Sequence, residues 1–65
     1  MKVDIHRIEL CMAEQGLSQR DLATISGVSR QNICNLLGRG RCLPATAGKL
    51  ARALGVPVAE IIINS

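Results

Sequence analysis

Apolar residues recur at helical spacing on either side of a glycine in the middle of the chain. Before Gly27, Leu22 and Ile25 fall on one face, which predicts a helix over about residues 19–25. Ser18 precedes this segment and can accept a hydrogen bond from the free amides of its first turn. Glycine readily adopts the positive φ that ends a helix, so the pattern predicts a short helix followed by a tight turn.

A second helical pattern follows this turn. Ser29 offers another N-cap, and Ile33, Leu36 and Leu37 lie at helical spacing, which predicts a helix over about residues 30–37. We expect this apolar face to pack back on the preceding helix. The opposite face is then left exposed.

The rest of the chain supplies three more segments with a helical pattern. We expect helices over about residues 4–14, with Asp4 as the N-cap, over about residues 45–53 and over about residues 58–63. The pattern therefore predicts a single all-α domain of five short helices that spans residues 1–65.

The exposed face of the predicted helix over residues 30–37 is polar. It carries side chains that can form hydrogen bonds with the edges of bases, namely Arg30, Gln31, Asn32 and Asn35. Two short helices joined by a glycine turn, the second with a polar outer face, are typical of a helix-turn-helix that binds DNA. The alternative is an ordinary pair of helices in a small bundle, whose polar side chains are merely solvated.

The composition limits the class of protein. The chain of 65 residues has no aromatic residue, so its core must consist of aliphatic side chains, methionine and cysteine. No apolar run is long enough to span a bilayer, and we find no secretory signal. Three cysteines, an odd number, without an export segment indicate reduced thiols and a cytoplasmic protein.

Positive charge is concentrated around the predicted helix-turn-helix. Six basic residues against one acidic residue give residues 18–52 a net charge of +5, whereas residues 1–17 and 53–65 each carry −1. A basic segment of this kind attracts the phosphates of nucleic acids. Solvated arginines are common on helices, so the charge favours a DNA partner only together with the helix-turn-helix.

Several short runs of residues carry a specific resemblance to a known family. Residues 17–19 read Leu-Ser-Gln, residues 27–29 read Gly-Val-Ser and residues 50–56 read Leu-Ala-Arg-Ala-Leu-Gly-Val. Over residues 8–63 the chain resembles the Cro/CI-type family of lambdoid phage repressors, also called the XRE family. The resemblance implies a compact five-helix lambda-repressor-like domain. It also implies binding to double-stranded operator DNA, usually as a two-fold homodimer, with the third helix in the major groove.

The resemblance implies roles for individual residues as well. The family's base-reading positions fall on Arg30, Gln31 and Asn35, with Asn32 as a weaker candidate beside them. Arginine suits guanine, whereas glutamine and asparagine suit adenine.

Phosphate contacts are expected around the same helix. The resemblance places them at Gln19 and Ser29, where the N-termini of helices present free amides. From their chemistry and position we add Arg39 and Arg41. Several relatives carry basic side chains slightly later in the loop, so the phosphate contacts of this chain must differ in detail.

Two apolar residues depart from the family together. Many relatives have an arginine in the first helix and a glutamate at the end of the third, which form a buried ion pair. This chain has Met12 and Leu37 at those positions. Replacing a buried ion pair with packed apolar side chains is often neutral or favourable, so we predict direct contact between Met12 and Leu37.

Three consecutive isoleucines lie in the last predicted helix. Ile61, Ile62 and Ile63 cannot all face one way on a helix, so one of them is expected near the surface. We interpret the three residues as a dimer interface. The alternative is that all of them belong to the core.

Two other classes of function stay open. One is a protein-interaction module, such as an antitoxin-like domain, that binds a protein through its third helix or its isoleucines. The other is a redox sensor in which oxidation of Cys34 blocks DNA binding, although a lone cysteine is more often incidental.

The sequence offers little support for metal binding or catalysis. His6 with Cys11, or Cys34 with Cys42, lacks the close spacing of a structural zinc site. Nothing resembles a pair of nucleophile and base or a pair of catalytic carboxylates. We therefore expect no enzyme activity, metal, cofactor, small-molecule substrate or membrane partner.

Overall fold

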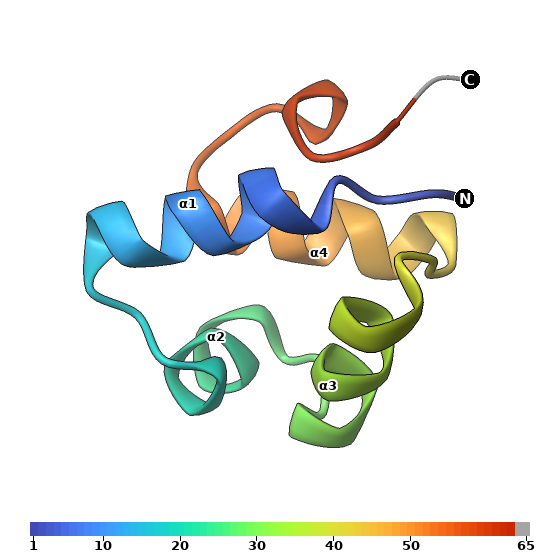
Figure 1. Cartoon of the computed structure of the whole chain (residues 1–65). Coiled ribbons are helices and arrows are strands. Elements are labelled where there is room, and N and C mark those ends of the chain that lie inside the picture. The colour runs from blue at the N-terminus through green and yellow to red at the C-terminus, as the bar shows by residue number, and fades with distance from the viewer. Residues whose placement is uncertain (64–65) are drawn as a thin grey trace.

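The computed structural model describes residues 1–63 of the chain. These residues form an all-helical fold, which confirms the expected fold class (Figure 1). The elements are α1 (Ile5–Gln15), α2 (Gln19–Ser26), α3 (Arg30–Arg39), α4 (Pro44–Leu54) and the 3-10 turn η1 (Val58–Glu60).

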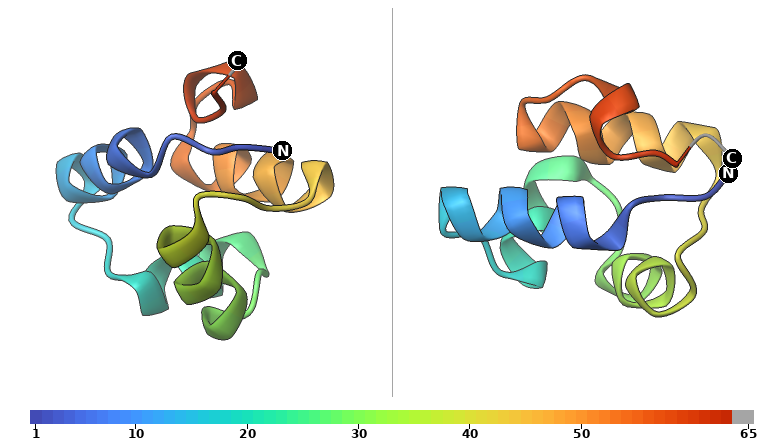
Figure 2. Two further views of the ribbon diagram at one scale, coloured as in Figure 1. Left: turned by 45° about the vertical axis from the view of Figure 1, so that its right-hand side comes forward. Right: turned by 45° about the horizontal axis from the view of Figure 1, so that its top comes forward.

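The helices lie at two levels in the view of Figure 1. In Figure 1, α1 and α4 extend across the upper part of the molecule, and α2 and α3 lie below them. α2 packs against both α3 and α4, and α4 also packs against η1. The views in Figure 2 show the N-terminal and C-terminal segments near each other, on the side away from α2.

The first three helices each begin at a residue whose side chain caps the helix. Asp4, Ser18 and Ser29 each accept a hydrogen bond, at 3.0 to 3.1 Å, from the backbone amide three residues later. These are the three caps expected from the sequence. Gly27 adopts a left-handed φ of 76° and ends α2, which is also as expected.

The structure differs from the expected helices at two places. α3 continues through Arg39 rather than ending near residue 37, because Gly40, with a φ of 73°, ends it. The predicted helix over residues 58–63 is wrong, because only Val58–Glu60 form a single 3-10 turn. The next residues use their backbone groups to pair with the N-terminal segment and cannot continue a helix. The described chain thus has four α-helices and this turn.

Residues 1–4 form an extended segment between two distant parts of the chain. On one side the segment pairs with residues 40–42, and the Val3 amide donates a hydrogen bond to the Gly40 carbonyl at 2.9 Å. On the other side it pairs with residues 61–63 through hydrogen bonds of 2.8 and 3.0 Å. The Val3 side chain is buried. So short a segment shows no periodicity, and the sequence analysis therefore missed it.

The hydrophobic core draws on all four α-helices and both ends of the chain. Its largest fully buried side chains are Val3, Ile8, Leu22, Ile33, Leu50 and Ile61. Ile25, which we expected beside Leu22 in this core, is 55% exposed, so that expectation is wrong. The inner side of α2 runs from Leu22 towards Ala23 and Ser26. Ile25 lies roughly 60° from Leu22 in the opposite sense, because successive helix residues are about 100° apart.

Met12 and Leu37 both belong to this core. Met12 is buried, and Leu37 is partly buried against the same cluster. Their direct contact remains a prediction. An ion pair in this core would lose its hydration, which costs free energy. Two apolar side chains avoid that desolvation penalty.

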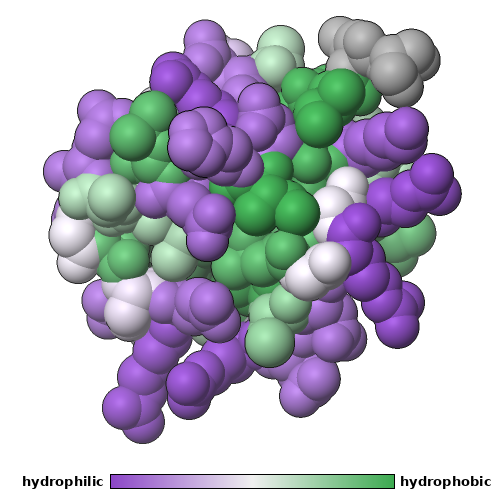
Figure 3. Space-filling view, viewed as in Figure 1, coloured by the Kyte–Doolittle hydropathy of each residue, from purple (hydrophilic) through white to green (hydrophobic). Residues whose placement is uncertain are grey.

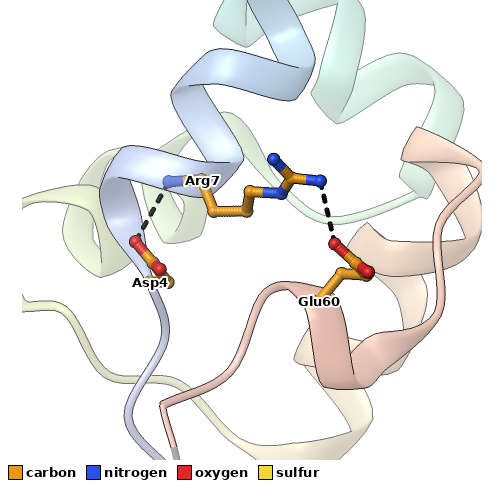
Figure 4. Close-up of polar contacts among 3 residues, drawn as sticks. All are labelled: Asp4, Arg7 and Glu60. Atoms are coloured by element: carbon orange, nitrogen blue, oxygen red, sulfur yellow. Dashed lines mark hydrogen bonds and ion pairs between the residues drawn. The ribbon is translucent and has the colours of Figure 1, made fainter.

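Polar contacts tie α1 to the C-terminal part of the chain. One guanidinium nitrogen of Arg7 donates to the Glu60 carboxylate at 2.8 Å, and the Arg7 amide donates to Asp4 (Figure 4). The two side chains of this ion pair are 41% and 44% exposed, so it contributes at most about 1 kcal/mol. The Gln15 side-chain amide donates to the Leu54 carbonyl at 2.6 Å, which satisfies one of the free carbonyls at the end of α4.

Asp21 and Ser18 form a reciprocal cap at the start of α2. The Ser18 amide donates to the Asp21 carboxylate at 3.0 Å, and the Asp21 amide donates to the Ser18 hydroxyl oxygen at 3.1 Å. The bond from the Ser18 amide, followed by that from the Ser18 side chain, holds the pKa of Asp21 below its ordinary value of 3.8.

We expect Asp21→Asn to reduce the acid sensitivity of the fold. Because the folded-state pKa is depressed, the ionised carboxylate stabilises the fold above about pH 4, and this stabilisation is lost as the pH falls through the folded pKa. The free energy of unfolding of the wild type should therefore approach that of the variant between about pH 5 and about pH 2. Chemical denaturation at a series of pH values measures this.

Glu9→Gln is the matched control, since it neutralises an exposed carboxylate in the middle of α1. It should leave the acid sensitivity close to that of the wild type. An Asp21→Asn variant that loses stability with acid as steeply as the wild type would contradict the assigned role of this cap.

Candidate nucleic-acid interface

α3 is anchored by one apolar stripe. Ile33 and Leu36 are 0% and 3% exposed, and Leu37 is half-buried beside them. This stripe belongs to the same core as Leu22 of α2, and the two helices pack together. Because an α-helix repeats every 3.6 residues, the buried stripe determines which side chains face outward.

The residues opposite the buried stripe are Gln31, Asn35 and Gly38, and we refer to them as the outer ridge. All three are exposed. The Gln31 side-chain amide donates to the Asn35 side-chain oxygen, one turn later, at 3.4 Å. Whichever carboxamide donates, the pair retains a further hydrogen-bond donor and a further acceptor for another molecule.

One flank of the outer ridge faces the start of α2. An open depression lies there, lined by Gln19, Arg30, Gln31 and Cys34. The structure therefore brings Arg30, expected to read bases, beside Gln19, expected to bind phosphate.

The other flank faces the loop after α3 and the start of α4. A second depression there is lined by Asn32, Asn35, Leu36, Arg39, Arg41, Cys42, Leu43 and Thr46. Arg41 lies in the loop that pairs with the N-terminal segment, opposite Lys2. Leu43 makes no side-chain cap at the start of α4, so the first amides of that helix are not capped by a side chain. This depression is thus lined by two arginines and by two asparagines, one of which, Asn35, belongs to the outer ridge.

The charges of this region all lie at the surface. Among the residues that the structure describes, no polar or charged side chain is buried. Hydrophilic side chains project from the lower edge of the molecule in Figure 3, where α2 and α3 lie. The one acidic residue between positions 18 and 52, Asp21, is engaged in the cap of α2. The side-chain charges of residues 18–52 that remain outside this cap are therefore all basic.

Comparison with known proteins agrees with this geometry. The family model of the Cro/C1-type HTH DNA-binding domain matches residues 7–64. The chain belongs to the Cro/C1-type helix-turn-helix family. It is accordingly a DNA-binding domain of the kind found in regulators. No curated protein and no solved structure matched the chain.

All the residues expected to contact DNA in this Cro/C1-type domain are exposed. They are Gln19, Ser29, Arg30, Gln31, Asn32, Asn35, Arg39 and Arg41. The Ser29 hydroxyl caps α3 by accepting from the Asn32 amide at 3.1 Å. The individual DNA contacts remain predictions.

The expected dimer interface needs a correction. Ile61 is fully buried, so its side chain cannot reach a second subunit, and this part of the prediction is wrong. It fills the core because the chain turns back at η1 to pair with the N-terminal segment. Ile62 is half-buried and Ile63 is 47% exposed, so only these two remain candidates.

The structure places two further residues beside those expected to contact DNA. Gly38 was expected beyond the end of the helix but lies on the outer ridge within α3. Thr46 of α4 is partly buried and lines the second depression. Gly40 rather than Gly38 takes the positive φ that ends α3, and the place of Thr46 in the depression depends on the tertiary structure.

In residues 1–63 no helix is both long and apolar enough to cross a membrane. In the same residues no group of three His, Cys, Asp or Glu side chains could hold a metal ion.

The three thiols differ in their surroundings. Cys34 is exposed on α3, Cys42 is half-buried in the second depression and Cys11 is buried in the core. Burial raises the pKa of the Cys42 thiol, and the N-terminal ammonium and a hydrogen bond with the Ala47 backbone only partly offset this effect. The thiolate is the reactive form, so burial makes Cys42 the slower of the two accessible thiols.

We therefore expect iodoacetamide to modify Cys34 first and Cys42 more slowly, and Cys11 only when the protein unfolds. Mass spectrometry of peptides from timed reactions measures the three rates. In urea the rates should become similar, which serves as the control. Modification of Cys42 as fast as Cys34 in the folded protein would contradict this order.

Proposed function

We propose that the chain is a sequence-specific transcriptional regulator, acting as a repressor, that inserts α3 into the major groove of operator DNA. One observation carries the proposal: the apolar stripe of α3 is buried, whereas its outer ridge of Gln31, Asn35 and Gly38 is exposed and polar. A major groove admits an α-helix with its polar side chains directed at base edges. Occupation of the operator would repress transcription by excluding other proteins.

Arg30, Gln31 and Asn35 would read the sequence, with Asn32 beside them. Arg30 offers paired donors, which match the O6 and N7 acceptors of guanine. The Gln31–Asn35 pair offers a donor and an acceptor, which match N7 and the N6 amino group of adenine. The pair already holds its two side chains together, which reduces the entropy lost on binding.

The phosphate contacts would lie on both flanks of the outer ridge. Gln19 and Ser29 stand at the starts of α2 and α3, where amides can donate to phosphate oxygens. Arg39 and Arg41 line the depression on the other flank. Contacts of this kind set the register of a protein on DNA without reading its sequence.

We expect Arg30→Ala and Arg41→Ala to affect DNA binding in different ways. Arg30→Ala should reduce the preference for the selected operator over its mismatched forms by about 5- to 150-fold, because one bidentate contact is lost. Arg41→Ala should weaken binding to all duplexes alike and lower the salt slope by about 1. Fluorescence anisotropy over a range of salt concentrations measures both effects.

The operator for this assay comes from selection of bound sequences from a random duplex pool. Arg52→Ala is the control for loss of charge, since Arg52 is exposed on α4 and lines neither depression. Equal losses on every duplex for Arg30→Ala and Arg41→Ala would show that Arg30 does not read bases.

The proposal includes a two-fold homodimer that uses Ile62 and Ile63. Supporting it, Met1 and Ile63 are 50% and 47% exposed on neighbouring segments, and Figure 3 shows hydrophobic surface beside the C-terminal segment. Residues 61 and 63 use backbone groups to pair with the N-terminal segment. Because backbone groups alternate in an extended segment, those of Ile62 face the other way, where a strand of the second subunit would pair.

We expect Ile63→Asp to prevent dimerisation, because it places a charge in the apolar contact. Analytical ultracentrifugation, with and without a palindromic operator whose half-sites are about 34 Å apart, measures the assembly. Ile25→Asp is the matched control, since Ile25 is an isoleucine of α2 with 55% exposure. An Ile63→Asp variant that still dimerises would refute this interface.

The proposal gives the protein no catalytic step and no cofactor. Its partner, DNA, together with three free cysteines, is consistent with a cytoplasmic protein.

A further inference from the structure

Gly38 occupies an unusual place on the outer ridge. It lies in the last part of α3, is exposed, and falls on the same line as Gln31 and Asn35. Along this line the side chains become shorter, from Gln31 to Asn35, and Gly38 has no side chain. The residues just beyond Gly38 include Arg39 and Arg41, both exposed.

The fold itself does not require glycine at this position. The glycines with positive φ are Gly16, Gly27, Gly40 and Gly55. Gly38 is not among them, and a Cβ added to it would meet no atom within 4 Å. Glycine within a helix is less stable than alanine because it loses more backbone freedom on folding. Gly38 therefore weakens α3 without allowing any closer packing within the subunit.

Gly40 provides the contrast, because the fold explains it completely. Its φ of 73° favours glycine, and a Cβ there would lie 3.4 Å from the Ile5 side chain. At Gly38 neither reason applies, and the same is true of Gly48 in α4. Gly38 differs from Gly48 in lying on the outer ridge, where a glycine allows another molecule to approach the helix backbone closely.

We infer that Gly38 is where the sugar-phosphate backbone of DNA approaches α3 most closely. The inference rests on the proposed function, in which the N-terminal part of the outer ridge faces base edges. Gly38 lies about 10 Å further along the helix axis than Gln31, at 1.5 Å per residue. The nearby guanidinium groups of Arg39 and Arg41 match a phosphodiester chain rather than base edges.

The lack of a side chain at Gly38 then sets how deeply α3 enters the groove. A methyl group at this point would hold the helix away from the sugar-phosphate wall. It would lengthen the phosphate contacts of the two arginines, whatever the base sequence. Gly38 thus acts as a positioning residue of the DNA interface.

The test compares Gly38→Ala with Gly48→Ala. Gly48 also lies in a helix, would also place its Cβ more than 4 Å from other atoms, and lines neither depression. Both variants should raise the Tm by about 2–8 °C, because alanine favours the helix. Thermal unfolding followed by circular dichroism measures this shift and shows that both variants fold.

DNA affinity then separates the two variants. The probes are the selected operator duplex and a random-sequence duplex of the same length, measured by fluorescence anisotropy. Gly38→Ala should lose about tenfold or more in affinity for both duplexes, and Gly38→Gln should lose more. Gly48→Ala should stay within about twofold of the wild type on both. The ratio of the two affinities should stay within about twofold of the wild-type ratio for Gly38→Ala, unlike for Arg30→Ala.

Two results would overturn the inference while leaving the proposed function intact. One is wild-type affinity of Gly38→Ala for both duplexes. The other is a loss confined to the selected operator, which would place Gly38 against a base instead of the backbone. A wild-type protein that binds neither duplex at low salt would overturn the proposed function and this inference with it.

Discussion

Burial of Ile33 and Leu36 is the interaction on which the functional surface depends. The two side chains join α3 to the same core as Leu22 of α2, and their burial fixes which face of the helix is turned inward. Since the helix repeats every 3.6 residues, anchoring one stripe places Gln31 and Asn35 on the outside. Stability and recognition therefore use opposite faces of one short helix.

The small size of the protein explains a second feature of its design. A chain of 65 residues without aromatic side chains can bury only a modest core. Residues 1–4 add backbone hydrogen bonds to this modest core, because they pair on one side with residues 40–42 and on the other with residues 61–63. The loop that carries Arg41 is thus braced by the first residues of the chain, far away in sequence.

One residue of the outer ridge, Gly38, lowers the stability of α3. Caps and apolar contacts hold α3 at its start and along its inner face, yet Gly38 adds a weak helix former where nothing within the subunit needs one. Local departures from helix preference are expected where a surface must accommodate another molecule. The chain belongs to a family of DNA-binding domains, and DNA is the molecule that we propose for this surface.

Local signals allowed much of this structure to be predicted from the sequence. Three helices begin at side-chain caps, which are Asp4, Ser18 and Ser29. The apolar period of α3 predicts which of its faces is exposed. Both signals can be found in the sequence because caps and periodicity act within about one turn of helix. The exposure of Ile25 and the pairing of residues 1–4 were not predicted, and the sequence left open whether Ile61 is buried or lies in an interface. These depend on contacts between segments that are dozens of residues apart, and such contacts leave no pattern in a short stretch of sequence. The sequence by itself thus determined the helices and the polar face of α3, whereas only the tertiary structure decided which side chains at the edges of the core are covered.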